Sequence, residues 1–456
     1  TLPGAILVIS INALHYALVA WLYGHFRRGG KMLALFSFPF VWVAIEYLRA
    51  FSDLRFNWLV LAHTQTYYLP LIQIAEYTGY LGISFILVIL GILLYNIFSL
   101  GKFWKWLNAV AILLIALALF IFGQNRINRI EAQQFSLLKA GLIQPNVDPY
   151  EKWEPSFQKE AFGMLMKSSR NMVKQKPDLI VWPETAVPFY LRARFTALQE
   201  IYRFLDSSRV YLLTGSPDYE YFEAEDDYHT YNAAFFFRPF EHSFESHYKI
   251  TLVPGSETMP FKRQFPFLRK VNVGGGDFFP GTKYTVFKFK VEVKPGKFDG
   301  EKYVEILTAE PHKTNIGLSA IICYESVFPD LVRRFISGGA NLLTIITNDG
   351  WFGETSGPYQ HAQYAVLRAV ENRVSIIRCA NTGISGFISP TGKYLTRAGL
   401  NTRQNKIAEI PIVQRKTFYT RKGEWLGNFT LLMSLLFIFI KLFGYFVQMK
   451  SAGKKK

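Results

Sequence analysis

Three residues with complementary chemistry stand at or near the ends of predicted strands. Cys323 closes an apolar run that begins at Ile316 and has the length and composition of a buried strand. Glu184 follows a shorter apolar run through a Trp-Pro pair that ends the strand, and Lys249 precedes a loop that carries Glu257. Chemistry in α/β proteins concentrates where core strands end, so we expect the thiol, the carboxylate and the ammonium to share one site.

This set of groups can transfer an acyl group through a covalent intermediate. The thiolate is the nucleophile, and a thiol needs a base or a cation to reach that form. Glu184 can accept the thiol proton and later return it. Lys249 supplies a fixed positive charge for the thiolate and for the oxyanion of a tetrahedral intermediate. We therefore expect the pKa of Cys323 to lie below the value of about 8.5 that a free thiol has.

Each motif alone also fits a structural role. A single buried cysteine is more often a small hydrophobic residue than a nucleophile. The only other cysteine, Cys379, could form a disulfide with Cys323, but we expect it to be a core residue. His247 and His361 are the candidates for a Cys-His arrangement, and neither suits it well. No His and Cys residues have zinc-ligand spacing, so we expect neither a metal nor a cofactor.

The composition is that of a membrane protein. Of the 456 residues, 50% are hydrophobic, 41 are Phe and 25 are Tyr, and the net charge is +17. A basic excess can indicate nucleic-acid binding, but here long apolar segments accompany it and no basic-aromatic nucleic-acid motif is present. The expected partner of the positive charge is therefore anionic lipid, with no role for nucleic acid.

Five apolar segments are long enough to cross a bilayer as helices, for which about 20 residues suffice. They cover residues 3–24, 32–51, 69–100, 106–123 and 425–447. Basic residues follow the first segment, the third segment and the last segment, and these three basic stretches are expected on the cytoplasmic side. Residues 125–424 are then outside the cytoplasm. Glu46 and Arg49, three residues apart in the second segment, predict either a mutual ion pair or a contact with a lipid headgroup.

Residues 130–415 predict one large α/β domain, because strand-like runs alternate with helix-like stretches. The strand-like runs are Leu137–Ile143, Leu179–Trp182, Val210–Thr214, Ala233–Phe237, Ile316–Cys323, Leu342–Thr347, Val374–Cys379 and Ser385–Ser389. The helix-like stretches are 156–174, 190–207, 326–337 and 358–373. A run of acids and tyrosines at 218–229 predicts a solvated loop. Residues 259–283 predict either a long mobile loop with membrane-facing side chains or a disordered insertion.

The motifs resemble those of a known superfamily. Trp-Pro-Glu at 182–184, Tyr-Lys at 248–249 and Cys-Tyr-Glu at 323–325 are similar in type and order to the Glu-Lys-Cys triad of the nitrilase superfamily. The apolar segments narrow the resemblance to the apolipoprotein N-acyltransferase family, which completes bacterial lipoprotein maturation. Further matching stretches are Phe56-Asn57-Trp58, Thr78-Gly79-Tyr80-Leu81-Gly82, Gln144-Pro145-Asn146 and the Thr347–Gly353 segment. The stretch 253–257 departs from the family's usual Val-Pro-Phe-Gly-Glu, although its final acid, Glu257, keeps its distance from Lys249.

The resemblance implies a nitrilase-like αββα sandwich domain inserted between transmembrane helices of an α-helical bundle. It implies a bundle of about four spans over residues 1–128, an extracytoplasmic catalytic domain over 129–420, and a transmembrane helix with a basic cytoplasmic tail over 421–456. The family commonly has eight spans, so three N-terminal spans are expected to precede the given sequence. The implied location is the bacterial inner membrane, with the catalytic domain on the periplasmic side.

The resemblance also implies the reaction. Cys323 attacks the ester of a phospholipid, typically phosphatidylethanolamine, and forms a thioester, and the N-terminal amine of a diacylglyceryl-modified apolipoprotein then takes the acyl chain. Glu184 is the general base and acid, while Lys249 and the backbone N–H after Cys323 hold the oxyanion. Glu257 tunes Lys249 or orients the amine. The other supporting positions around the pocket are Trp153, Tyr324, Glu325 and Trp351.

Two further functions fit the sequence. A membrane-anchored carbon-nitrogen hydrolase acting on a small amide needs the same three groups and no pocket that faces lipid. A non-catalytic lipoprotein-binding or scaffold protein could keep the fold without the chemistry.

Overall fold

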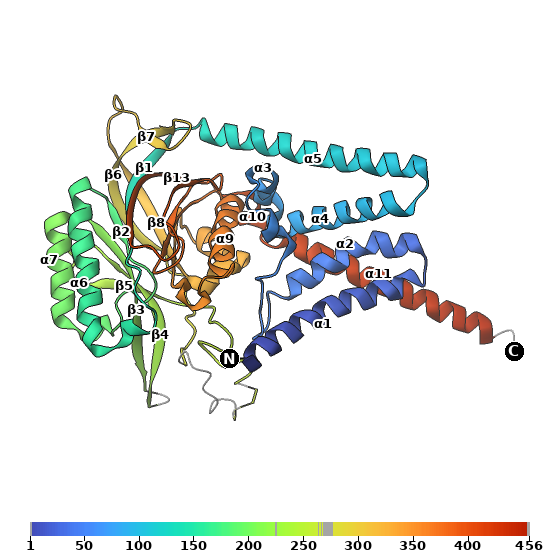
Figure 1. The fold of residues 1–456 in the computed structure, drawn as a ribbon, viewed down its shortest axis with the longest axis horizontal. Helices are drawn as coiled ribbons and strands as arrows, with labels where there is room; N and C mark the ends of the chain where they lie inside the picture. The colour runs from blue at the N-terminus through green and yellow to red at the C-terminus, as the bar shows by residue number, and fades with distance from the viewer. Residues whose placement is uncertain (1, 224–225, 263, 266, 268–276, 454–456) are drawn as a thin grey trace.

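The chain folds into a large α/β domain with long helices that extend from one side of it (Figure 1). The computed structural model describes residues 2–453 except 224–225, 263, 266 and 268–276. The chain starts in the long helices, enters the α/β domain at β1 and returns through a final helix to the same end of the molecule.

The strands of the domain form one continuous hydrogen-bonded path. Its order is β12-β11-β10-β9-β8-β6-β1-β2-β3-β4-β5, with β13 added to β1 and β7 added to β6. The strands are β1 (Phe135–Gln144), β2 (Leu179–Val181), β3 (Tyr211–Phe222), β4 (Asp227–Phe237), β5 (Phe244–Tyr248), β6 (Phe287–Phe298), β7 (Tyr303–Glu305), β8 (His312–Ile322), β9 (Leu342–Thr347), β10 (Ser375–Ala380), β11 (Gly386–Ile388), β12 (Tyr394–Arg397) and β13 (Gln404–Ile412).

The path folds into two layers that face each other. Strands β1, β2 and β3 are parallel in one layer, β8, β9 and β10 are parallel in the other, and β6 joins the layers by pairing with both β1 and β8. Side chains of alternate residues, among them Val181 of β2, Ile322 of β8 and Ile346 of β9, share one buried cluster between the layers. This cluster is the central core of the domain.

Helices cover the two outer faces. α6 (Pro155–Met172) and α7 (Phe195–Ser208) pack on Ile180 and Trp182, whose side chains leave the first layer on its other side. α8 (Pro329–Ser337) and α9 (Gly357–Asn372) cover the second layer around Ile321. The order helix, sheet, sheet, helix confirms the predicted αββα sandwich.

The eight predicted strands and four predicted helices of the domain all exist; β9 has the predicted bounds, and each of the others is shifted at one end or both. The sequence pattern missed β5, β6, β7, β12 and β13. The prediction of a solvated loop at 218–229 is wrong where the structure describes these residues, because 218–222 belong to β3 and 227–229 to β4, which pair as a hairpin. Of the predicted loop 259–283, residues 263, 266 and 268–276 lie outside the described residues, including the glycine run at 274–276. Its last part is attached to the domain, since Gly281 N donates to the carbonyl of Lys249 at 2.8 Å.

Long apolar helices form the second part of the molecule. Four of the described helices are long and apolar enough to cross a membrane: α2 (Lys31–Leu48), α4 (Ala75–Ser99), α5 (Lys102–Glu131) and the Trp425–Tyr445 part of α11 (Trp425–Gly453). The first predicted span lies in α1 (Leu2–Arg27), which packs beside α2, and its crossing of a membrane stays a prediction. The α1–α2 turn, the α4–α5 turn and the C-terminal end of α11 all lie at the end opposite the α/β domain (Figure 1).

The predicted pairing of Glu46 with Arg49 is replaced by contacts with the loop that follows α2. Glu46 Oε1 accepts the backbone N–H of Leu61 at 3.0 Å, and Arg49 donates to the carbonyl of Leu59 at 2.9 Å. Both charged side chains are almost fully buried. Their structural role is therefore to hold the loop from 52 to 68 against the helices.

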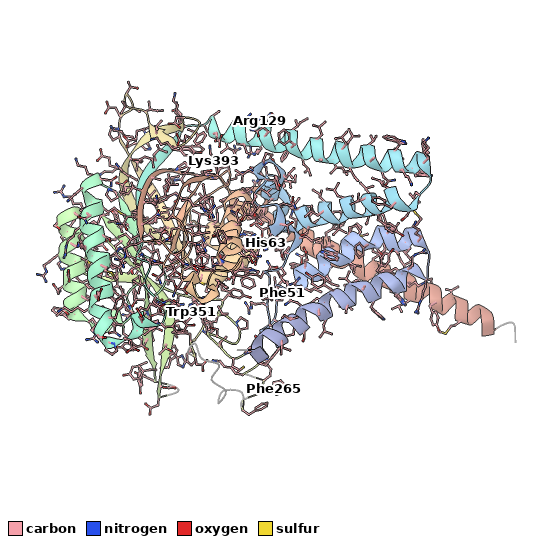
Figure 2. The ribbon with its side chains drawn as sticks, viewed as in Figure 1. Phe51, His63, Arg129, Phe265, Trp351 and Lys393 are labelled. Carbon is pink, nitrogen blue, oxygen red and sulfur yellow. The ribbon has the colours of Figure 1, made fainter. Side chains whose placement is uncertain are left out.

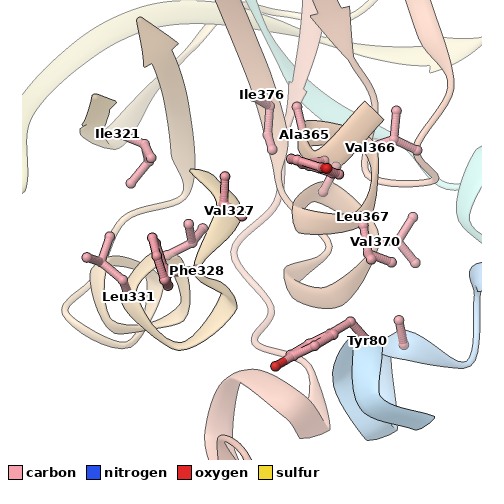
Figure 3. Close-up of a cluster of buried hydrophobic side chains, with 14 of the residues drawn as sticks. Tyr80, Ile321, Val327, Phe328, Leu331, Ala365, Val366, Leu367, Val370 and Ile376 are labelled. Atoms are coloured by element: carbon pink, nitrogen blue, oxygen red, sulfur yellow. The ribbon is translucent and has the colours of Figure 1, made fainter. Parts of the chain in front are cut away.

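The helices and the α/β domain share one hydrophobic core. Figure 3 shows Tyr80 of α4 beside side chains of α9 such as Leu367 and Val370, and all three belong to one buried cluster. α4 is interrupted at Gly79, whose positive φ of 62° suits glycine and whose missing side chain leaves space for the Tyr419 ring. The Tyr80 N–H released at this break donates to Glu371 Oε1 at 3.0 Å.

A buried ion cluster fixes the same junction. Arg373, at the end of α9, donates through Nε to Glu76 Oε2 of α4 at 2.8 Å and through Nη1 to Gln73 Oε1 at 2.6 Å. Arg126 of α5 holds the other oxygen of Glu76 at 2.6 Å. The side chains of Arg373 and Glu76 are 6% and 3% exposed, so this pair lies away from water.

Replacement of Arg373 by methionine should strongly destabilise the junction. Removing one partner of a buried pair costs about 3–5 kcal/mol, and we expect the lower end because Glu76 keeps Arg126. The matched control is Arg170→Met, which breaks the exposed pair with Glu200 and should cost less than about 1 kcal/mol. Thermal unfolding in detergent measures both. Equal losses in the two variants would contradict the role of the cluster.

Candidate active site

Cys323 lies on a sharp turn between β8 and a short 3₁₀ helix (Cys323–Val327). Its backbone φ of 53° is in the left-handed region, which is uncommon for a residue with a side chain. Such strain persists only where the surroundings hold it, and it often marks a functional position. Cys323 is half-buried, whereas Cys379 is a fully buried core residue whose thiol contacts backbone carbonyls. Both cysteines are free, so the disulfide alternative is wrong.

Glu184 lies just beyond β2, on a second strained turn. The next residue, Thr185, has a φ of 45°. A side chain on Gly215 of the neighbouring β3 would approach the Glu184 Cα to 2.7 Å, so a glycine there lets the turn lie directly against the strand. The preceding Trp182 is fully buried and donates its indole N–H to Ser169 of α6. These contacts hold the turn that places the Glu184 carboxylate beside Lys249.

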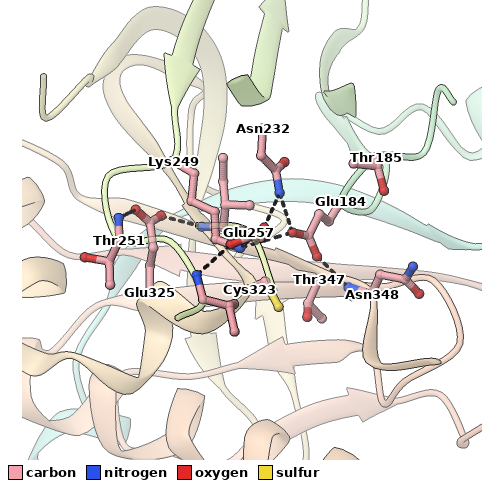
Figure 4. Close-up of polar contacts among 12 residues, drawn as sticks. Glu184, Thr185, Asn232, Lys249, Thr251, Glu257, Cys323, Glu325, Thr347 and Asn348 are labelled. Carbon is pink, nitrogen blue, oxygen red and sulfur yellow. Dashed lines mark hydrogen bonds and ion pairs between the residues drawn. The ribbon is translucent and has the colours of Figure 1, made fainter. Parts of the chain in front are cut away.

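Lys249 is fully buried between two carboxylates (Figure 4). Its Nζ lies 2.8 Å from Glu257 Oε1 and 3.4 Å from Glu184 Oε1. Burial alone would lower the pKa of Lys249, but the negative charges of Glu257 and Glu184 raise it above the usual value. Lys249 is therefore held in its charged form at neutral pH.

Glu257 holds its position through its own loop. Its Oε2 accepts the backbone N–H of Val253 at 2.8 Å, and Gly255 between them has a φ of 76°. Glycine at 255 thus permits the loop to close, and the departure from the usual family spelling leaves Glu257 beside Lys249.

Asn232 of β4 is a functional candidate that the sequence pattern missed. Its Nδ2 donates to Glu184 Oε1 at 2.8 Å and to Glu257 Oε1 at 3.1 Å. Glu184 Oε2 meanwhile accepts the backbone N–H of Asn348 at 2.9 Å. No motif surrounds Asn232, because its role depends on strand pairing between β4 and β5 rather than on its sequence neighbours.

Glu325 connects the turn of Cys323 to the segment of Lys249. Its Oε2 accepts the N–H of Ile322 at 2.8 Å, and its Oε1 accepts the N–H groups of Ile250 and Thr251 at 2.6 and 3.1 Å. Burial raises the pKa of Glu325 to about 7, although these N–H groups and Lys249 favour the charged form. Glu325 is thus a positioning group for two of the three candidate catalytic residues.

The three predicted aromatic residues have different places. Tyr324 is buried, and its hydroxyl donates to the carbonyl of Arg55 in the loop after α2 at 2.8 Å. Trp153 is partly exposed beside Lys152, and Trp351 is exposed with its ring 5.2 Å from that of Tyr150 (Figure 2). Tyr324 therefore connects the Cys323 turn to the loop after α2. The two tryptophans instead contact Tyr150 and Lys152, which precede α6.

Lys152 is a second buried lysine that the sequence analysis missed. Its Nζ donates to Thr185 Oγ1 at 2.5 Å, next to Glu184. Burial lowers the pKa of Lys152 to about 8, against the opposing effect of the Glu184 charge. Among the described residues, no group of three His, Cys, Asp or Glu side chains has the geometry to hold a metal ion.

The expected low pKa of Cys323 is wrong. Burial raises the pKa of its thiol, the Glu184 carboxylate raises it further, and Lys249 opposes both without reversing them. The sequence could suggest the cation but not the depth of the site or the nearby negative charge. The resting site therefore holds a protonated thiol beside an anionic cluster.

His361 is not a base for the thiol. Its Nε2 lies 3.1 Å from the backbone carbonyl oxygen of Cys323 and 2.9 Å from Ser326 Oγ, while its Nδ1 lies 2.8 Å from Asp349 Oδ1. The other candidate, His247, is buried in β5 with its ring against Phe335. Glu184, whose charge acts on the Cys323 thiol, remains the candidate for that base.

Comparison with known proteins identifies relatives over most of the chain. A family described as carbon-nitrogen hydrolase matches residues 139–418, and one described as the N-terminal domain of apolipoprotein N-acyltransferase matches residues 1–93. A protein named apolipoprotein N-acyltransferase from Geobacter metallireducens is 35% identical over 92% of this chain and 76% of its own length. A protein of the same name from Chlorobaculum tepidum is 30% identical over 92% of this chain and 79% of its own length.

Among solved structures, a nitrilase-superfamily protein of Saccharomyces cerevisiae matches 60% of this chain and 90% of its own. The two are 18% identical, with a TM-score of 0.41.

The raised pKa of Cys323 predicts how its thiol reacts with a small alkylating reagent. The alkylation rate should keep rising through pH 9, because the thiolate fraction is still growing there. Glu184→Gln removes a negative charge that disfavours the thiolate, so it should increase the rate at pH 8 several-fold. Mass spectrometry of the Cys323 peptide measures the rate.

Glu200→Gln is the matched control, because Glu200 is a partly exposed acid on α7 that pairs with Arg170, and its replacement should leave the rate unchanged. A plateau below pH 8 in the unmodified protein, or slower alkylation in Glu184→Gln, would contradict the electrostatics of the site.

Proposed function

The chain belongs to the apolipoprotein N-acyltransferase family, and from this premise we propose that it transfers an acyl chain from a membrane phospholipid to the N-terminal amine of a diacylglyceryl-cysteine in apolipoproteins. The transfer passes through a thioester on Cys323. The observation that carries the proposal is the convergence of Cys323, Glu184 and Lys249 in one buried site, on a domain that shares its core with apolar helices.

In the first step, the acyl group moves from oxygen to sulfur. Sγ of Cys323 attacks the ester carbonyl carbon of the phospholipid while Glu184 takes the thiol proton, and a C–S bond forms. The ester carbonyl oxygen becomes the oxyanion of a tetrahedral intermediate. When that intermediate collapses, the C–O bond breaks and Glu184 gives the proton to the departing alkoxide. The products are a lysophospholipid and the thioester on Cys323.

In the second step, the acyl group moves from sulfur to nitrogen. The neutral amine of the diacylglyceryl-cysteine attacks the thioester carbonyl, and Glu184 accepts a proton from the attacking nitrogen. Collapse breaks the C–S bond, and the proton on Glu184 returns to the sulfur as the amide product leaves. The same carboxylate therefore serves as base and acid in both steps, and the resting thiol is restored.

Lys249 and the backbone N–H of Tyr324 are the proposed partners of the oxyanion. The ammonium of Lys249 is held charged by Glu184 and Glu257, so it needs no proton transfer to act. The Tyr324 N–H belongs to the first turn of the 3₁₀ helix after Cys323, where N–H groups lack a partner within the helix. Preorganised donors of this kind typically supply the largest share of catalysis in acyl transfer.

The long helices supply the route for substrates with acyl chains. Each buried CH₂ favours the apolar phase by about 0.8 kcal/mol, so both substrates stay in the bilayer and the site must meet them there. The aromatic side chains of Trp153, Trp351 and Phe51 are exposed and therefore available for contact with lipid. The basic turns at the far ends of the helices support a cytoplasmic membrane location with the α/β domain outside the cytoplasm.

The supporting residues have proposed roles that follow from their contacts. Glu325 keeps the Cys323 turn and the Lys249 segment at a fixed separation, and Tyr324 fixes that turn to the loop at Arg55. Glu257 keeps Lys249 charged. Asn232 holds the carboxylates of Glu184 and Glu257 side by side.

A phospholipid with a labelled acyl chain tests the covalent intermediate. The purified protein should carry hydroxylamine-sensitive label on Cys323 and should pass it to a diacylglyceryl peptide with a free amine. Cys323→Ala should abolish both signals, and Cys379→Ala is the matched control that should keep both. Labelled peptide produced by Cys323→Ala would refute the thioester route, and labelled free fatty acid with no labelled peptide would identify a hydrolase.

A further inference from the structure

The peptide group between Cys323 and Tyr324 is hydrogen-bonded on its buried side by two side chains. The carbonyl oxygen of Cys323 accepts Ser326 Oγ at 2.8 Å and faces His361 Nε2 at 3.1 Å. Ser326 and His361 are both fully buried. This carbonyl and the Tyr324 N–H, which the proposed function assigns to the oxyanion, are opposite ends of one planar amide.

A chain of buried charges holds His361 in this position. His361 Nδ1 lies 2.8 Å from Asp349 Oδ1, and Arg378 donates to Asp349 Oδ2 at 2.8 Å. Thr347 also donates to Asp349 Oδ1, at 3.0 Å. Burial by itself disfavours the charged form of Asp349, but Arg378 and His361 together hold its pKa well below the usual value. Asp349 is therefore an ionised acceptor.

The hydrogen-bond partners assign the protons of His361. The Asp349 carboxylate can only accept, so Nδ1 carries a proton. Ser326 gives its single hydroxyl proton to the Cys323 carbonyl, so Nε2 faces two acceptors, Ser326 Oγ and that carbonyl oxygen. Nε2 is then placed to donate to the Cys323 carbonyl. The ring of Trp58 lies beside His361, with its centroid 5.4 Å from that of the imidazole.

We propose that His361 is a positioning residue that strengthens the oxyanion site indirectly. It contacts the Cys323 carbonyl and so polarises the Cys323–Tyr324 amide, whose N–H faces the oxyanion. A donor on the carbonyl oxygen draws electron density from the nitrogen and makes the N–H of the same amide a stronger donor. The same contact fixes the left-handed conformation of Cys323, which determines where that N–H points. This inference rests on the acyl-transfer function proposed above.

Two reactions of the Cys323 thiol depend differently on the Tyr324 N–H. Attack on an ester builds an oxyanion and depends on the Tyr324 N–H, whereas alkylation of the thiol by a small haloacetamide builds none. His361→Leu should therefore lower the rate of acyl-enzyme formation about tenfold to a hundredfold, less than the loss when an oxyanion donor is removed outright. The KM for phospholipid and the alkylation rate of Cys323 should stay within about twofold.

Two further variants keep the test decisive if His361→Leu does not fold. His361→Gln retains a neutral N–H donor near the Nε2 position and should recover part of the lost rate. Ser326→Ala removes only the second donor to the same carbonyl and should show the same pattern with a smaller loss. His312→Gln is the matched control, since His312 is an exposed residue of β8 and its replacement should change neither reaction.

The measurement is single-turnover formation of the labelled thioester, run beside alkylation and thermal unfolding for each variant. Acylation and alkylation that fall together in His361→Leu and Ser326→Ala would overturn the inference, because a loosened turn impairs both. Acylation unchanged in both variants would overturn it as well, while Cys323→Ala remaining inactive would leave the proposed function standing. Activity in Cys323→Ala would instead refute the proposed mechanism itself.

Discussion

The site depends on one constraint, which is that a buried ammonium must have its charge balanced by fixed carboxylates. Lys249 has no access to water, and Glu184 and Glu257 replace the water around it. With a neutral thiol, these three charges leave the cluster one negative charge in excess. In the proposed reaction, the thiol proton passes to Glu184 and that negative charge moves to the oxyanion beside Lys249. The proposed reaction thus moves one charge within the cluster and creates no new one.

The backbone makes this arrangement possible by bringing two strained turns to the ends of parallel strands. β2 and β8 belong to different layers of the sandwich, and the residues that carry chemistry come at the points where each strand ends. Cys323 and Thr185 have left-handed backbone conformations, so the extended conformation of each strand ends there. Strain of this kind costs of order 1–3 kcal/mol for each residue, and the hydrogen bonds of Glu325 and the close approach at Gly215 offset it.

The sequence predicted an α/β domain, its main strands and the three converging groups, because each of these depends on local patterns, whereas the αββα sandwich was implied by the family resemblance. A buried strand is visible as an apolar run, and a side chain at its end is visible as the residue that follows. Asn232 and the contact of His361 with the Cys323 carbonyl escaped, because each joins segments that are far apart in the chain. The pKa of Cys323 was predicted in the wrong direction for a related reason: burial is a property of the whole fold, and it outweighs the nearby cation.

The helices take part in the site and do not only attach it to a surface. The loop from 52 to 68 is held to α2 by Glu46 and Arg49, and the same loop accepts the Tyr324 hydroxyl at Arg55 and donates from Asn57 to the carbonyl of Val327. The 3₁₀ helix after Cys323 is therefore fastened at two points to the apolar part of the molecule. The position of the turn that carries the thiol is therefore coupled to that of α2 through this loop.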